Sequence, residues 1–146
     1  MAKAAEPLIP LACACASLRR AARAVTRLYE RNMKYTGLTP TQFTLLQALD
    51  LSGPTPQGRL GDALALDSAT LTRTLGPLAR KGIIEKTAGK DRREYRWMLT
   101  PAGRRGLARA LPAWKRSQSS MRARLGNARW ERLTADLAAV ATEARF

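Results

Sequence analysis

The residues with the clearest chemistry lie between positions 68 and 80, where leucines recur at helical spacing among hydroxyl and basic side chains. If the leucines face a core, a helix turning about 100° per residue directs Arg73 and Arg80 outward. Thr70 and Thr72 flank these arginines. Arginine can bond both acceptors of a guanine, and threonine can bond phosphate or touch a thymine methyl group. The predicted chemistry is therefore readout of a DNA duplex, with no catalytic group involved.

The residues of this helix have separate expected roles. Ser68 is placed to cap the helix, and Ala69 is small enough for close approach of the backbone to DNA. Arg73 is the candidate for a bidentate guanine contact, whereas Arg80 is expected to reach a phosphate. Pro77 removes one helical hydrogen bond and is expected to kink the second half of the helix. A helix whose charges are merely solvated is the alternative interpretation.

A basic hairpin is predicted after this helix, with strands at 83–87 and 94–99. Asp91 at its tip can accept hydrogen bonds from backbone N–H groups and hold the side chain of Arg93 in a fixed direction. An arginine held in this way can enter the minor groove, whose narrow A·T stretches attract arginine. The tip residues expected to contact DNA are Lys90, Asp91, Arg92 and Arg93. A solvated hairpin tip is the alternative.

The elements that must position these residues form a mainly α-helical chain with a small β-hairpin wing. A short helix at 57–64 and the helix from Ser68 form a helix-turn-helix pattern, which the hairpin extends to a winged helix-turn-helix over 38–100. Residues 11–35 and 101–146 carry apolar stripes that need a partner surface, so they are expected to be dimerisation helices. The length suits one domain, 1–146.

Cys13 and Cys15 are the only cysteines and the only hint of a regulatory signal. In a continuous helix their side chains point about 200° apart, so they cannot bridge each other or hold one ion. The simplest interpretation is two small buried hydrophobic residues. Two functional alternatives stay open: a disulfide between subunits, or a frayed N-terminus whose thiolates bind a soft metal or arsenite.

The overall charge indicates a polyanionic partner. The 146 residues include 26 Lys and Arg but 11 Asp and Glu, a net charge of +15. Nucleic acid is the first candidate partner and an anionic membrane surface the second. The alternative without a polyanionic partner is a soluble protein whose arginine content reflects a high-GC genome. Histidine, a phosphate-binding glycine loop and a carboxylate motif are all lacking, so no enzyme, required cofactor or metal site is expected. The apolar segments are too short for a membrane span and 8–16 is a poor secretion signal, so a cytoplasmic location is expected.

Several motifs of the chain resemble the MarR family of bacterial transcriptional regulators. They are Leu38-Thr39-Pro40-Thr41-Gln42-Phe43, residues 67–73, residues 78–84, and Asp91-Arg92-Arg93 followed by Leu99-Thr100-Pro101-Ala102-Gly103. The resemblance spans roughly residues 15–140, and the pair Gly76-Pro77 departs from the family's commonest pattern. By motif match, 68–81 is the recognition helix and 83–99 is the wing.

The resemblance implies a homodimer joined through its first and last helices, binding a pseudo-palindromic operator, usually as a repressor. It also implies release from DNA by thiol oxidation or by a ligand, such as a phenolic or aromatic effector between the dimer helices and the DNA module. The leading hypothesis is thus a sequence-specific dimeric repressor. The alternatives are an architectural protein that coats DNA without sequence choice, and a redox-active or metal-handling protein that uses Cys13 and Cys15.

Overall fold

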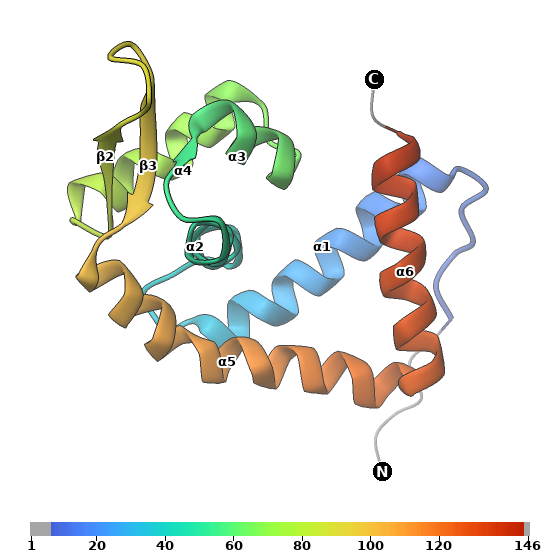
Figure 1. Cartoon of the computed structure of the whole chain (residues 1–146). Helices are drawn as coiled ribbons and strands as arrows, with labels where there is room; N and C mark the ends of the chain where they lie inside the picture. The colour runs from blue at the N-terminus through green and yellow to red at the C-terminus, as the bar shows by residue number, and fades with distance from the viewer. Residues whose placement is uncertain (1–6, 145–146) are drawn as a thin grey trace.

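The structure is a computed structural model that describes residues 7–144, so the ends of the predicted domain, 1–6 and 145–146, lie outside the described residues. The described chain is mainly helical and carries a small antiparallel sheet, which confirms the predicted fold class (Figure 1). Its elements are α1 (Ala14–Met33), α2 (Pro40–Ser52), β1 (Thr55–Pro56), α3 (Gln57–Leu64), α4 (Ser68–Arg80), β2 (Ile84–Ala88), β3 (Tyr95–Leu99), α5 (Pro101–Leu125) and α6 (Asn127–Glu143).

The sheet has the strand order β1-β3-β2, and all neighbours run antiparallel. The wing hairpin pairs Ile84 with Leu99 and Ala88 with Tyr95. On the other side of β3, Thr55 pairs with Trp97. Strand β1 has no sequence signal of its own, because two residues that follow a proline carry no alternating pattern. It ties the start of α3 to the wing.

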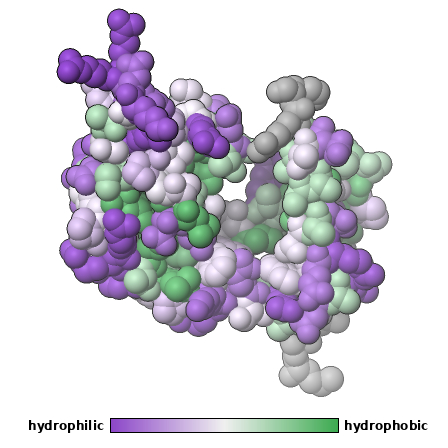
Figure 2. Space-filling view, viewed as in Figure 1, coloured by the Kyte–Doolittle hydropathy of each residue, from purple (hydrophilic) through white to green (hydrophobic). Residues whose placement is uncertain are grey.

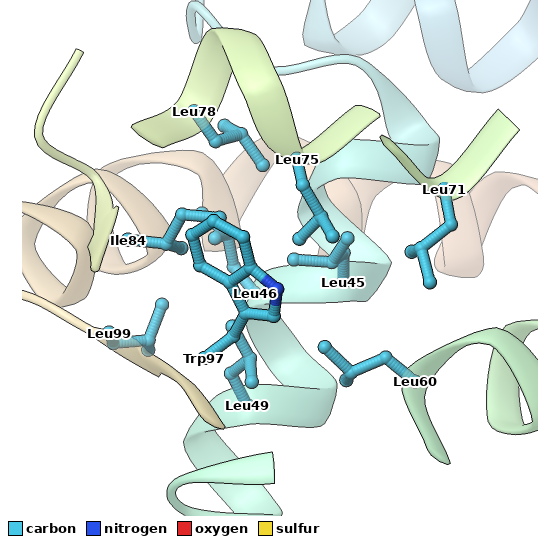
Figure 3. Close-up of a cluster of buried hydrophobic side chains, with 10 residues drawn as sticks. All are labelled: Leu45, Leu46, Leu49, Leu60, Leu71, Leu75, Leu78, Ile84, Trp97 and Leu99. Atoms are coloured by element: carbon cyan, nitrogen blue, oxygen red, sulfur yellow. The ribbon is translucent and has the colours of Figure 1, made fainter. Parts of the chain in front are cut away.

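A hydrophobic core holds the helix-turn-helix and the wing together (Figure 3). The inward leucines of α4 predicted from the sequence are buried there, and Trp97 fills the centre between α2 and the sheet. The members of this core are Leu45, Leu46, Leu49, Leu60, Leu71, Leu75, Leu78, Ile84, Trp97 and Leu99. Pro77 lies inside α4 but does not end it, since the helix continues to Arg80.

A second core joins the flanking helices to this module. Met33 at the end of α1, Phe43 on α2, and Ala110 and Ala113 on α5 are buried together. The ring of Phe43 stacks on that of Trp114 with centroids 5.7 Å apart. The end of α1 and the first half of α5 therefore form part of the module's support, beyond the dimerisation role expected of them.

Helix α6 stands apart from the module, on the far side of the bend at Gly126 (Figure 1). No residue of α6 is buried. Its apolar stripe, Leu133, Leu137 and Val140, is 38–46% exposed, and Figure 2 shows hydrophobic surface open along this arm. None of the described helices is long and apolar enough to cross a membrane.

Candidate DNA interface

The N-terminus of α4 is capped by Asp67, one residue before the expected Ser68. Oδ1 of Asp67 accepts a hydrogen bond from the backbone N–H of Thr70 at 2.8 Å. Ser68 is instead the first helical residue, and its side chain is exposed. Both residue types cap helices well, so the sequence allowed either register. The expectation for Ser68 as the cap is wrong, and its hydroxyl is free to face solvent.

A chain of hydrogen bonds runs from this cap to Arg73. The hydroxyl of Thr70 donates to Oδ2 of Asp67 at 2.7 Å, and Nη2 of Arg73 donates to the same hydroxyl at 3.1 Å. The backbone and side-chain bonds from Thr70 lower the pKa of Asp67, and the positive charge of Arg73 acts in the same direction. The guanidinium is thus held on the exposed face of α4. The Thr70 hydroxyl is occupied, which leaves its methyl group for contacts.

Thr72 is linked to the wing through Gln57, a residue that sequence reasoning missed. Nε2 of Gln57 donates to the hydroxyl of Thr72 at 3.3 Å, and the indole N–H of Trp97 donates to Oε1 of Gln57 at 3.1 Å. One side chain at the start of α3 therefore connects the second helix of the helix-turn-helix with the wing. The only sequence signal for this role was a polar residue at the start of a short helix.

The remaining predicted residues of α4 lie on its outer face. Ala69, Thr72, Arg73 and Arg80 are exposed, in contrast to the buried leucines between them. The helical periodicity predicted this division correctly. A Cβ added at Gly76 would come within 3.3 Å of the guanidinium of Arg80, so a larger residue there would displace that side chain.

The wing tip forms a compact turn whose basic side chains are exposed. The backbone N–H of Arg93 donates to Oδ1 of Asp91 at 3.1 Å, and the N–H of Gly89 donates to the carbonyl of Glu94 at 2.7 Å. Lys90, Asp91, Arg92 and Arg93 are all exposed, and the tip is hydrophilic in Figure 2. Asp91 does accept a backbone bond, as expected. However, the ion pairs within residues 7–144 do not include Asp91, so it does not hold the Arg93 guanidinium.

Two aromatic residues of β3 lie beside Lys86 on the wing. Trp97 is buried, and the ammonium group of Lys86 lies 5.1 Å from the centroid of its ring. The same ammonium lies 5.6 Å from the ring of Tyr95, which is 62% exposed. The wing thus combines a buried aromatic residue, Trp97, with an exposed basic and aromatic surface at Lys86 and Tyr95.

Comparison with known proteins identifies this arrangement. The sequence model of the MarR family matches residues 38–95, from α2 through the wing. A putative transcriptional regulatory protein for the hcr operon of Thauera aromatica is 33% identical over 113 residues, which cover 76% of this chain and 68% of that protein. The chain belongs to the MarR family. It is a DNA-binding transcriptional regulator, and its relatives are regulators rather than enzymes.

Solved structures of MarR-family regulators agree along nearly the whole chain. The transcriptional regulator MosR of M. tuberculosis in complex with DNA is 36% identical, with a TM-score of 0.81 over 90% of this chain and 96% of that one. PcaV of Streptomyces coelicolor in complex with its natural ligand is 25% identical, with a TM-score of 0.77 over 95% and 99% of the two chains.

The cysteines of this MarR-family chain are not buried. Cys13 adopts an extended conformation just before α1, Cys15 lies in its first turn, and both are exposed. The interpretation as buried hydrophobic residues is wrong. The argument from a continuous helix does not apply either, because Cys13 precedes the helix. Among the described residues, no group of three or more His, Cys, Asp or Glu side chains is placed to bind a metal ion.

Proposed function

We propose that this MarR-family regulator is a homodimeric repressor that binds a pseudo-palindromic operator. The observation that carries the proposal is the chain from Asp67 through Thr70 to Arg73, which fixes a guanidinium on the open face of α4 before DNA arrives. A pre-positioned arginine loses little conformational freedom on binding, and arginine is the commonest reader of guanine.

The roles of the individual residues follow from their exposure on α4 and the wing. Arg73 reads a guanine, while the methyl group of Thr70 and the side chain of Thr72 contact neighbouring bases or phosphate. Ala69 lets the helix approach closely, and Ser68 donates its free hydroxyl to phosphate. The outer contacts come from Arg80 and Lys90 on phosphate, and from Arg92 and Arg93 in the minor groove beside a turn shaped by Asp91.

Two copies are needed because one α4 reads only a half-site. The open stripe of α6, with Leu18 of α1 at 40% exposure, is the surface that a second copy covers. In this proposal residues 11–35 and 101–146 supply the dimer contacts, 38–100 supply the DNA contacts, and 1–146 act as one unit in the cytoplasm.

Release of the operator follows one of two signals. A cleft of about 310 Å³ between α2 and α5 has an apolar lining of Leu51, Leu107 and Leu111, together with the charged residues Arg104 and Asp50. This lining suits a small phenolic or aromatic effector. Alternatively, the exposed thiols of Cys13 and Cys15 are oxidised, or they bind a soft metal. Changing both cysteines to serine separates these signals, because only a thiol sensor would lose its response to oxidants and thiophilic metals.

A footprint on DNA selected from random sequences tests the proposal. We expect protection of one inverted repeat whose half-sites lie about one helical turn apart. Uniform protection that disappears steeply with added salt would overturn it in favour of an architectural protein that coats DNA.

A further inference from the structure

The positive charge of the chain is concentrated outside the module that carries α4 and the wing. Helix α5 has seven Lys and Arg residues and no Asp or Glu, and α1 has five arginines and one acidic residue, Glu30. Residues 38–100 contain nine basic and six acidic residues. Most of the net charge of +15 therefore lies on two helices that pack against each other, and DNA readout by α4 does not account for it.

One cleft between these two helices gathers four of the cationic side chains. It has a volume of about 760 Å³ and lies between the last two turns of α1 and the second half of α5, two helices that converge in Figure 1. None of its lining residues is acidic. They are Leu28, Arg31, Asn32, Lys115, Arg116, Ser119, Ser120 and Arg124.

A buried polar contact fixes the two walls of this cleft. Nδ2 of Asn32 donates to the hydroxyl of Ser117 at 3.0 Å, and that hydroxyl donates to the carbonyl of Ala113 at 3.1 Å. Ser117 is fully buried, whereas Asn32 also lines the cleft. The cationic side chains therefore lie on two helices whose relative position is fixed. This lowers the entropy cost of binding a ligand between the helices.

The cleft cations lack protein counter-charges among the described residues. The ion pairs there join Arg96 to Glu94 and Arg122 to Glu131, outside the cleft. Like charges held within a few residues of each other repel, and this repulsion is relieved when an anion binds between them. A single carboxylate would neutralise one of the four charges, whereas an oligophosphate would neutralise most of them.

We propose that the α1–α5 cleft binds a compound that carries two or more phosphate groups. Guanidinium groups bind phosphate oxygens in pairs, and the hydroxyls of Ser119 and Ser120 are additional donors at the same wall. The cleft is open to solvent and large enough to admit a ligand of nucleotide size. The site is separate from α4 and the wing, from the cleft between α2 and α5, and from the apolar stripe of α6 and Leu18 that the second copy is proposed to cover.

Calorimetric titration of the intact protein with inorganic tripolyphosphate, at fixed ionic strength, tests the site. The double variant Arg116→Gln with Arg124→Gln removes two cleft cations. The control, Arg105→Gln with Arg109→Gln, removes two exposed arginines of the same helix that do not line the cleft. We expect the cleft variant to weaken binding about tenfold or more, because hydrogen bonds to charged groups are lost, and the control less than about threefold.

A second variant tests the site in case the first does not fold. Ser119→Glu places an acidic group in the cleft at an exposed position and should weaken binding as much as the double variant does. Titration with ADP in parallel distinguishes a nucleotide from an inorganic oligophosphate as the better ligand. Equal weakening in the cleft and control variants, or no saturable binding to the parent, would overturn the site. Random-sequence duplex DNA that displaces tripolyphosphate, and that the cleft variant binds more weakly, would also overturn it by making this surface a second DNA contact.

Discussion

Trp97 of the wing donates its indole N–H to Oε1 of Gln57 at 3.1 Å, so the central strand of the sheet is bonded to the first residue of α3. The amide of Gln57 in turn donates to Thr72 on α4. The side chain of Gln57 therefore links the wing to α4, in addition to the hydrophobic core that packs the two together. Their relative position decides whether two neighbouring grooves are reached together.

Gln57→Leu removes both of these bonds. The indole N–H of the buried Trp97 then lacks its partner, so we expect the free energy of unfolding to fall by about 1–3 kcal/mol in urea denaturation. Affinity for the operator should fall further than affinity for random duplex. Thr72→Val is the matched control, since it removes only the exposed bond to Gln57. Equal loss of stability in both variants would show that the Trp97 bond is unimportant.

The carboxylate of Asp67 makes the helix cap dependent on pH. Because hydrogen bonds from Thr70 lower its pKa below the ordinary value of 3.8, the folded state favours the charged form. The resulting stabilisation is fully present above about pH 5 and is lost as the pH falls through the lowered pKa of the folded state. Asn caps a helix nearly as well as Asp but does not titrate. The melting temperature of the Asp67→Asn variant should therefore fall less than that of the parent between about pH 6 and pH 3. Parallel losses in thermal denaturation would contradict this assignment.

Arg73 and Arg93 should have different effects on DNA binding. Arg73→Ala is expected to cost about 1–3 kcal/mol on the operator and to relax sequence choice at one base pair, because a bidentate base contact is lost. Arg93→Ala should weaken binding mainly at sites with A·T-rich flanks. Fluorescence anisotropy on operator and random duplexes measures both. If Arg73→Ala weakens both duplexes equally, its guanidinium contacts a phosphate.

Local sequence signals predicted most of the fold. The capping box of Thr39 and Gln42, with Pro40 at the first helical position, marks the start of α2 in the sequence, because such signals act over a few residues. Helix α3 and the outer face of α4 were also placed correctly from periodicity alone. The family resemblance added the order of these elements.

Contacts distant in sequence could not be predicted in the same way. The bond between Gln57 and Trp97 joins residues 40 positions apart, and nothing in the local pattern of either residue marks it. The cap at Asp67 and the exposure of Cys13 each depended on where a helix begins, which sequence leaves uncertain by a residue or two. The clustering of cations between α1 and α5 likewise appears only once the helices are packed.

Gly103 in the Leu-Thr-Pro-Ala-Gly motif is needed for a close contact between α5 and the residue that precedes β2. Thr100 caps α5 through the N–H of Gly103 at 3.0 Å and also donates to the carbonyl of Gly82 at 2.6 Å. A Cβ at Gly103 would clash with the carbonyl oxygen of Ile83. Gly103→Ala should therefore destabilise the protein by about 1–3 kcal/mol in thermal or urea unfolding.

Gly106 is the matched control for this prediction, one turn further along α5. A Cβ there would have only the Arg109 guanidinium within 4 Å, at 3.9 Å. Gly106→Ala should raise stability by about 0.4–1 kcal/mol, because alanine restricts the unfolded chain and favours helix. If both substitutions destabilised the protein similarly, the cost would come from adding a side chain to α5 in general and not from the contact with Ile83.

Leu137 lies at the middle of the apolar stripe of α6 and is 44% exposed in the single chain. If a second copy covers this stripe, Leu137→Glu buries a charge at the contact and shifts the protein to monomers in sedimentation equilibrium. Leu51→Glu makes the same chemical change at a leucine that is 89% exposed on α2, and it should leave the dimer intact. The monomeric variant should also bind a full operator no more tightly than a half-site, since its two reading helices are no longer linked. A Leu137→Glu protein that remains a dimer would show that α6 is not the contact between copies.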